Sequence, residues 1–314
     1  MGLKLKLLKY SDILVVYDRN VADFAIKIAG SKPSLAIEAT EQTKTMDTVM
    51  AIDRWFLQQG ADRKTLVLAV GGGITTDIVG FAAAIYKRGI RYANVPTSLL
   101  GMVDAATGGK TGVNLDSFKN MLGAFQQPEF VHIDTDYLRT LPKRELLSGA
   151  AELLKTFIIA DRENYDKALK VISEGADPKA LEPLVKDAAK IKARIVKKDP
   201  RDEGRRMVLN LGHTYGHAIE WWQHAKGVAD PYTHGEAVSI GMAIAARKSE
   251  EAGIAKPGLA AKIKADLNYC GLPTELPCLE EDLREALEAD KKTEGGQLNF
   301  VYIKEIGSVT VKKI

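Results

Sequence analysis

Histidines are concentrated in one short part of this sequence. The chain contains 5 histidines, and three of them are His213, His217 and His234. On a helix, His213 and His217 would be one turn apart with both imidazoles on the same face, and His234 with an upstream carboxylate could complete a catalytic metal site. The same spacing also occurs on ordinary packed helices, so the spacing alone leaves both interpretations open. The small neighbours Gly212 and Gly216 favour the metal site, because a packed helix would fill that space.

A run of three glycines, residues 71–73, follows the clearest strand pattern, residues 65–70. Consecutive glycines let a backbone pass close to a diphosphate, whose charge the N-terminus of the next helix can receive. The run departs from the G-x-G-x-x-G fingerprint because Thr76 stands at the last glycine position, and a plain tight turn is the alternative. Ligands bind at the carboxyl ends of strands in doubly wound sheets, which favours a nucleotide here. Polar residues beyond the first and fourth expected strands emerge at the same edge: Asp18, Asn20, Thr97 and Ser98.

Basic residues gather between residues 190 and 206. Such a run is usually a solvated helix face, and the alternative is a pocket for an anionic small molecule. Residues 104–114 and 119–125 combine isolated polar groups with very small residues, as either a surface loop or a pocket between two domains would. Glu152 and Lys155 share a helix face, as an exposed ion pair or as part of a site. The basic run contains Lys190, Lys192, Arg194, Lys197, Lys198, Arg201, Arg205 and Arg206.

The first part of the chain alternates strand and helix patterns. Short apolar runs predict strands, and the segments between them predict helices that end at Gly30 and Gly60. This succession predicts a mostly parallel, doubly wound, Rossmann-like α/β sheet. We expect strands at residues 12–17, 34–38, 65–70, 92–95 and 130–133, and helices at 21–29, at 45–59 and from the glycine run to Tyr86.

Strand patterns nearly disappear after Pro142. We therefore expect two domains, an α/β domain at residues 1–142 and a mostly α-helical domain at residues 143–314. In the second domain we expect helices at residues 145–159, 162–173, 178–196, 212–224, 236–252, 256–269 and 279–290, and two short β segments at 298–303 and 308–311.

The composition limits the class of protein. The chain has 314 residues, 46% of them hydrophobic and 27% charged, which is ordinary for a globular protein with a substantial core. Its net charge of +3 is too small to indicate a nucleic-acid partner. Cys270 and Cys278 have no metal or redox spacing, in keeping with a reducing compartment. No apolar run approaches the roughly 20 residues that span a bilayer, and residues 1–8 lack the apolar core of a signal peptide. We expect a cytoplasmic protein without a membrane partner.

Seven motifs, in order along the chain, resemble one family, the 3-dehydroquinate synthases of the sugar-phosphate cyclase superfamily. The resemblance extends from about Asp18 to the end of the sequence, and so many ordered matches do not arise by chance. Ser98 stands where a second threonine is usual, and residues 221–233 form a slightly longer, more aromatic connection before His234. The motifs are GGG with Asp77 at residues 71–77, YKRG at 86–89, GGKTGVN at 108–114, KNMLGAF at 119–125, AELLK at 151–155, NLGHTYGHAIE at 210–220 and HGEAV at 234–238.

The resemblance implies a set of site residues. A divalent metal, normally zinc with cobalt as an alternative, would be held by Glu152, His213 and His234. His217 would instead contact the substrate near the leaving phosphate, which corrects the interpretation from helix spacing. The implied NAD contacts are Asp18, Asn20, Glu41, Lys44, Gly72, Gly73, Ile74, Asp77, Thr97, Ser98, Lys110, Lys119 and Thr140. The implied catalytic and substrate contacts are Asp104, Lys110, Asn120, Lys155, Lys192, Arg206, Asn210 and His217, with Lys291 or Lys292 and with Arg88 of the partner subunit in a homodimer.

The reaction that the resemblance implies converts 3-deoxy-D-arabino-heptulosonate 7-phosphate to 3-dehydroquinate and phosphate, a step of aromatic amino-acid biosynthesis by the shikimate pathway. NAD would be reduced and reoxidised in each turnover. Two alternatives are another sugar-phosphate cyclase and a metal-dependent polyol dehydrogenase, whose uncharged substrates need no array of lysines and arginines. A non-catalytic protein that binds a sugar phosphate or nucleotide is a third, against which an open metal position argues.

Overall fold

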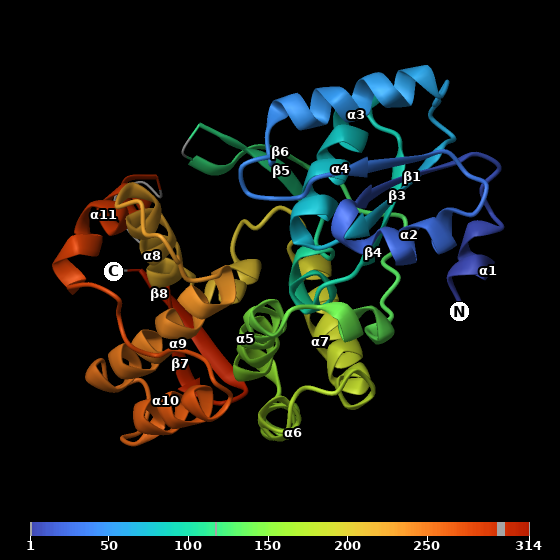
Figure 1. The fold of residues 1–314 in the computed structure, drawn as a ribbon. Helices are drawn as coiled ribbons and strands as arrows, with labels where there is room; N and C mark the ends of the chain where they lie inside the picture. Colours follow the sequence, from blue (N-terminus) through green and yellow to red (C-terminus); the bar gives the residue numbers. More distant parts are fainter. Residues whose placement is uncertain (1, 117, 294–298, 314) are drawn as a thin grey trace. The chain divides into compact units, whose positions relative to one another are not determined.

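The computed structural model describes residues 2–116, 118–293 and 299–313, of which 289–293 as backbone alone (Figure 1). The chain divides into two compact units, Met1–Leu141 and Pro142–Ile314, and this division adjoins the boundary expected at Pro142. Each unit is described by itself below.

The first unit is built on a four-stranded parallel sheet. Its strands are β1 (Ile13–Asp18), β2 (Ser34–Ile37), β3 (Leu66–Gly71) and β4 (Arg91–Pro96), in the order β2-β1-β3-β4. The central pairing sets Val15 opposite Leu68. Apolar, β-branched runs are buried on both faces of such a sheet, as parallel sheets require. The predicted doubly wound α/β class is confirmed.

Helices cover both faces of this sheet (Figure 1). Successive strand residues point to opposite faces, so Val15 packs with α2 (Ala22–Ala29), whereas Val16 packs with the helices on the other face. Those helices are α3 (Met46–Gln58) and α4 (Gly73–Ile85). A short helix, α1 (Leu3–Leu7), adds Leu7 to the α2 side. The sheet therefore fixes where the ends of its strands and the N-terminus of α4 lie.

In the first unit, a β-hairpin forms from residues that the sequence suggested as a polar surface loop or as the lining of a pocket. β5 (Lys110–Leu115) pairs antiparallel with β6 (Phe118–Phe125). Gly112 and Gly123 face each other, and a Cβ on Gly123 would lie 2.3 Å from the carbonyl oxygen of Thr111. Glycine lets the two strands approach closely here. The same glycines hide the alternating pattern of a strand, so the sequence did not predict this hairpin.

The strand expected at residues 130–133 is wrong. This segment forms a single parallel bridge, between Val131 and Asn94 of β4. The amide of Asn94 donates to the carbonyl of Phe130, and the amide of His132 donates to the carbonyl of Asn94. The amide of Glu129 also donates to the carbonyl of Tyr92, so this short run follows β4 through backbone contacts without forming a strand of the sheet.

The second unit is helical, with one hairpin. The helices are α5 (Lys143–Ala160), α6 (Arg162–Ser173), α7 (Pro178–Lys198), α8 (His213–Ala225), α9 (His234–Glu251), α10 (Leu259–Tyr269) and α11 (Arg284–Thr293), and the hairpin joins β7 (Asn299–Glu305) to β8 (Ser308–Lys313). The helix expected at 279–290 is divided into a 3₁₀ turn, Glu280–Leu283, followed by α11. Leu298, the expected start of the first β segment, lies outside the described residues.

α9 begins two residues before the expected start at Glu236. Thr233 caps the helix by accepting a hydrogen bond from the Glu236 amide, and the Glu236 side chain accepts one from the Thr233 amide. This capping box satisfies two amides at the helix start. His234 is therefore the first residue of α9, as His213 is the first residue of α8. Within the described part of the chain, no helix is long and apolar enough to cross a membrane.

Candidate active site

Three helices of the second unit bring one carboxylate and two imidazoles together. Glu152 lies on α5, and its Oε1 is 3.8 Å from Nε2 of His213 and 3.5 Å from Nε2 of His234. One ligand atom from each residue lies within 4.8 Å of the others. This is the donor set of a catalytic zinc site with room for a further ligand.

Glycines at the points where these helices meet allow this convergence. A Cβ on Gly235 would lie 2.0 Å from the carbonyl oxygen of Ser148, and a Cβ on Gly241 would lie 1.9 Å from that of Gly212. Gly212 itself has φ of +78°, a conformation that favours glycine. The start of α9 therefore rests directly on α5, and α8 begins directly against α9. These close approaches place His234 and His213 beside Glu152.

Burial and nearby cations control the charge of Glu152. The residue is fully buried, and Nζ of Lys155 lies 2.5 Å from its Oε2. Burial alone would raise the pKa of Glu152, but the Lys155 ammonium and the two histidines outweigh it and hold the pKa well below its usual range. Oε2 faces the Lys155 ammonium, and Oε1 faces Nε2 of both histidines. A buried, ionised carboxylate of this kind is suited to a cation.

The surroundings of His213 favour its neutral form. Burial, with help from the Lys155 ammonium, lowers the pKa of His213 well below its usual value. Its Nδ1 lies 3.2 Å from the carbonyl oxygen of Leu211. A hydrogen bond to that carbonyl puts the proton on Nδ1 and leaves Nε2, the nitrogen nearer Glu152, as the free donor.

His234 has a second carboxylate behind it. Burial lowers its pKa, but Glu220 and Glu152 outweigh burial and raise the pKa of His234 to about 10. Nδ1 of His234 lies 3.3 Å from Oε2 of Glu220, which is itself mostly buried. A carboxylate on one ring nitrogen orients the other nitrogen toward a metal. Glu220 belongs to the NLGHTYGHAIE motif at residues 210–220, but its position in the motif indicates no role for it.

His217 lies beside this cluster without belonging to it. Its ring centroid is 5.2 Å from that of His213 and 6.4 Å from that of His234. The group of residues that could hold a metal contains His234 in its place. Helix spacing alone had paired His213 with His217, and the structure corrects that pairing because the first residue of α9 reaches Glu152 from a different helix.

Other expected substrate contacts of the second unit are buried cations. Lys155 is 1% exposed, Lys192 on α7 is 5% exposed and Arg206 is 4% exposed. Arg206 lies with Asn210 in a 3₁₀ segment, Arg205–Asn210, that packs against α5 and α7. Lys192 and Arg206 belong to the basic run, and their burial shows that these two members do not lie on a solvated helix face. The side chains of Lys291 and Lys292 are not described.

The glycine run lies at the carboxyl end of β3, where α4 begins. Gly72 is the residue before α4, and a Cβ added to it would lie 3.3 Å from the hydroxyl oxygen of Ser98. The amide of Thr97 donates to the carbonyl of Gly71, so the ends of β3 and β4 are adjacent. Asp18, at the end of β1, is half-buried, and burial raises its pKa. The structure thus brings this predicted polar edge together within the first unit.

Lys44 links two groups of expected contacts in the first unit. Its buried Nζ lies 2.7 Å from Oδ2 of Asp77 on α4 and 2.6 Å from Oδ1 of Asn120 on β6. Asn114, which received no individual role from the sequence, bonds both the Asn120 amide and the Glu41 carboxylate. Expected cofactor and substrate residues therefore belong to one hydrogen-bonded network.

The remaining expected residues of the first unit come from several elements. Lys110 begins β5, Lys119 lies on β6, and Thr140 ends a 3₁₀ turn. Asp104 lies in a short helical segment, Gly101–Ala105. Ile74 is in the first turn of α4, and Asn20 donates its amide to Asp18. Arg88 is exposed in the turn after α4, with φ of +64°.

Two solved structures share this fold almost completely. A 2-epi-5-epi-valiolone synthase from Streptomyces hygroscopicus subsp. jinggangensis, with NAD⁺ and Zn²⁺ bound, has a TM-score of 0.89 and 27% identity, covering 98% of this chain and 89% of that one. A 2-deoxy-scyllo-inosose synthase complexed with carbaglucose-6-phosphate, NAD⁺ and Co²⁺ has a TM-score of 0.86 and 27% identity, covering 97% and 88%. The fold and the candidate metal cluster define the class, the carbocycle-forming synthases.

Sequence relatives identify the family within that class. The 3-dehydroquinate synthase of Acidithiobacillus ferrooxidans is 42% identical over 312 residues, covering 95% of this chain and 84% of the relative. Residues 34–148 match the family described as 3-dehydroquinate synthase N-terminal, and residues 149–293 match 3-dehydroquinate synthase C-terminal. The chain belongs to the 3-dehydroquinate synthase family.

Proposed function

We propose that this chain performs the family's reaction, from 3-deoxy-D-arabino-heptulosonate 7-phosphate to 3-dehydroquinate and phosphate, with NAD and a divalent metal ion. The observation that carries the proposal is the buried group of Glu152, His213 and His234. Oε1 of its buried carboxylate faces Nε2 of both imidazoles, and each imidazole has an oxygen behind Nδ1. This donor set fits Zn²⁺ or Co²⁺.

A metal ion held by these three residues supplies Lewis-acid stabilisation of negative charge on a substrate oxygen. The chain's own residues prepare the position for it. Lys155 keeps Glu152 ionised in a buried place, and Glu220 orients His234. His217, next to His213 and outside the ligand group, would contact the substrate where phosphate leaves.

The lysines and arginines bind the substrate's charges. Its carboxylate and phosphate need cations that are fixed before binding, because charge-assisted hydrogen bonds orient a ligand best when the donors do not move. Lys192 and Arg206 are buried, and the Arg206 backbone is tied to Asp199. We assign the substrate contacts to Lys155, Lys192, Arg206, Asn210 and His217 in the second unit and to Asp104, Lys110 and Asn120 in the first.

We assign the cofactor to the edge formed by the glycine run. Gly72 and Gly73 would let a diphosphate approach the start of α4, where backbone amides can donate hydrogen bonds to it. NAD bound there would take a hydride and return it in the same turnover. Supporting contacts would come from Asp18, Asn20, Glu41, Lys44, Ile74, Asp77, Thr97, Ser98, Lys110, Lys119 and Thr140.

A homodimer would complete the site. Arg88 is exposed, and both it and Lys87 have positive φ, at +64° and +48°. A non-glycine residue held in this conformation is typical of functional sites. The Lys87 ammonium donates to the carbonyl of Ala61, which fixes the turn. We assign Arg88 to the phosphate site of a partner subunit, where a guanidinium suits a phosphate dianion. A cytoplasmic location stays a prediction from composition.

Metal removal tests this proposal most simply. Phosphate release from the heptulosonate phosphate, in the presence of NAD, should disappear after treatment with a chelator and return with zinc or cobalt. The tightly bound metal of the untreated protein should be measured in parallel. Full phosphate release by a protein verified to contain no metal would overturn the metal assignment.

A further inference from the structure

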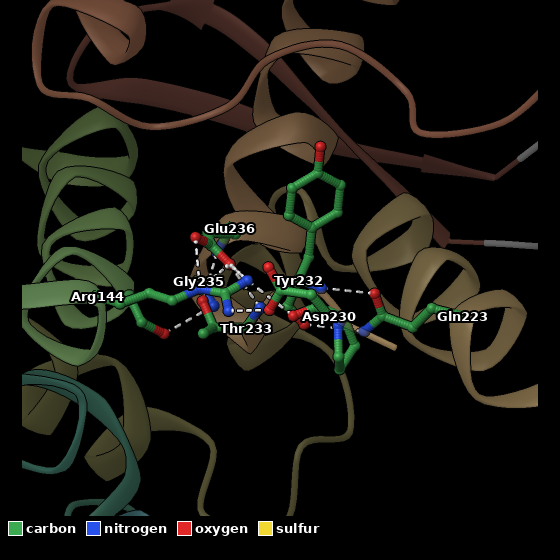
Figure 2. A network of polar contacts seen from close by, with 9 residues as sticks. Arg144, Gln223, Asp230, Tyr232, Thr233, Gly235 and Glu236 are labelled. Atoms are coloured by element: carbon green, nitrogen blue, oxygen red, sulfur yellow. Dashed lines mark hydrogen bonds and ion pairs between the residues drawn. The ribbon is translucent and has the colours of Figure 1, made fainter. Parts of the chain in front are cut away.

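The loop before His234 is tied to α5 by one arginine. Arg144, in the first turn of α5, donates from Nη1 to Asp230 at 2.6 Å and from Nη2 to the carbonyl of Pro231 at 2.8 Å. Its Nε and Nη2 reach the Glu236 carboxylate at 3.1 and 2.9 Å. Figure 2 shows the side chains of Asp230 and Glu236 converging on this guanidinium. Arg144 thus holds the loop and the first turn of α9 at once.

Arg144 shares a helix face with a metal-site residue. Arg144, Ser148 and Glu152 are four residues apart in turn, so they form one stripe along α5. Arg144 grips Glu236, Ser148 accepts a hydrogen bond from the Gly235 amide at 3.0 Å, and Glu152 faces His234. Three successive turns of α5 therefore each contact the start of α9. The register between the two helices sets the distance from His234 to Glu152.

The other side of the loop is also fixed. Gln223, on α8, donates to the carbonyl of Tyr232 and accepts from its amide, both at 2.8 Å (Figure 2). The Glu236 carboxylate accepts two kinds of hydrogen bond. One comes from the Thr233 amide and caps α9, and the other comes from the Arg144 guanidinium. The residues that carry His234 are thus joined to α5 and to α8, which also carry the other two members of the cluster.

We propose that Arg144 is a positioning residue for the metal centre, acting through Glu236 and residues 230–231 to fix His234 in its ligating place. This inference rests on the proposed metal site. An exposed ion pair usually contributes little to stability. This contact differs, because the guanidinium forms a fork on a carboxylate whose side chain is 15% exposed and also binds the adjoining loop. A ligand that is fixed before the metal arrives loses less entropy on binding.

The direct test is metal affinity, measured apart from turnover. Arg144→Met should bind Zn²⁺ about tenfold more weakly than the wild type and release it faster to a chromophoric chelator, since groups that orient metal ligands typically change affinity by about 10- to 100-fold. With Co²⁺, its visible absorption should differ in shape, because the ligand geometry is looser. Glu236→Gln should show the same weakening, because its amide still caps α9 but no longer offers a charge to Arg144.

Arg247→Met is the matched control. Arg247 lies on α9, the helix of His234 and Glu236, and forms a 3.1 Å contact with Glu251; its side chain is 49% exposed, against 41% for Arg144. It is about 20 Å along α9 from His234 at 1.5 Å per residue. This variant should keep wild-type Zn²⁺ affinity. Melting temperatures of the metal-free proteins show what each change does to folding alone.

The outcomes are separable. Wild-type Zn²⁺ affinity in both Arg144→Met and Glu236→Gln, even with a lowered melting temperature, would make the contact structural only and overturn the inference. Should Arg144→Met not fold, Glu236→Gln decides the same question. If the wild-type protein and its His213→Ala variant bound Zn²⁺ equally, the metal site itself would be wrong, which is a failure of the proposed function.

Discussion

At the scale of single residues, the site depends on environments that sequence spacing does not reveal. His213 and His217 are chemically identical and one turn apart, yet their surroundings differ. His213 has the carbonyl of Leu211 behind one nitrogen and Glu152 before the other. His234, at the start of α9, joins the group that could hold a metal, in the place that helix spacing offered to His217. The motif predicted where the site lies, and the position of the start of α9 determines that His213 and His234 form the cluster.

The two histidines should therefore give different defects. His213→Ala should lose both bound zinc and phosphate release, because it removes a neutral imidazole ligand. His217→Ala should keep zinc and lose turnover, because it removes a contact to the substrate. Metal content and phosphate release, measured on the same preparations, distinguish the two. Loss of zinc from His217→Ala with zinc retained in His213→Ala would reverse the assignment.

Asp53, on α3, should make stability depend on pH. Burial raises its pKa to about 6, and its Oδ1 has no hydrogen-bond partner among the described residues. The folded state therefore favours the protonated acid, a contribution that is present below pH ~4 and lost as the pH rises through about 6. Asp53→Asn should melt about 3 °C higher at pH 8 and show little difference at pH 4.

Asp47→Asn is the control for that measurement. Asp47 lies in the first turn of the same helix, where a negative charge is favourable. It should not raise the melting temperature at pH 8. An equal rise in both variants would indicate a general effect of net charge instead of the burial of Asp53.

At the scale of elements, the sequence predicted the strands and helices that have a regular pattern of apolar residues. It did not predict the strands in which glycine interrupts that pattern. The parallel strands and most helices follow from apolar runs and amphipathic spacing. The hairpin of β5 and β6 does not, because Gly112 and Gly123 stand where side chains would have shown alternation. The strand expected at residues 130–133 is wrong although its residues are apolar, because the segment pairs with β4 at one bridge only.

The site residues also divide into those that the sequence indicates and those that only the fold reveals. Motifs supplied Glu152, His213 and His234, but the groups that orient them come from tertiary contacts. Arg144 bonds residues 86 to 92 positions away in the chain, a separation that no local pattern reports. Glu220 acts through a contact between α8 and the start of α9. Spacing identifies candidate ligands, whereas positioning residues need the fold.

The hydrogen-bonded network of Lys44, Asp77 and Asn120 should couple the affinity for NAD to the affinity for the substrate. Lys44 bonds Asp77, an expected NAD contact, and Asn120, an expected substrate contact. Lys44→Met should weaken NAD binding and raise the KM for the substrate, each by about tenfold or more, since each loss is of a hydrogen bond to a charged donor. Asn120→Ala should raise KM with nearly unchanged NAD affinity.

Lys27→Met, at an exposed position of α2, is the control and should change neither quantity. Binding of NAD is measured by calorimetry on the free enzyme, and KM by phosphate release. A Lys44→Met variant that weakened NAD binding alone would show that the contact to Asn120 plays no part in substrate recognition.

At the scale of the whole molecule, the proposed homodimer can be tested by mixing two inactive variants. If Arg88 acts in its partner's site, subunits carrying Arg88→Ala and subunits carrying His213→Ala are each inactive as homodimers but complement each other when mixed. In a heterodimer both defects then fall in one site and leave the other intact. Random mixing in equal amounts makes half of the dimers mixed, each with one of two sites whole, so about a quarter of wild-type activity should return.

Subunit exchange is confirmed by mass spectrometry of the intact complex. No recovered activity in a mixture that contains heterodimers would place Arg88 in its own subunit's site or in a structural role. A protein that stayed monomeric while fully active would remove the need for a partner altogether.

The balance of phosphate and NADH during steady turnover tests the central claim most directly. The proposed reaction takes a hydride and returns it, so phosphate should accumulate with each turnover while absorbance of reduced nicotinamide stays at the level of the enzyme present. Both are followed in one cuvette, with the heptulosonate phosphate as substrate and NAD in excess. NADH formed in amounts equal to an oxidised product, with no phosphate released, would contradict the account and make the chain a dehydrogenase.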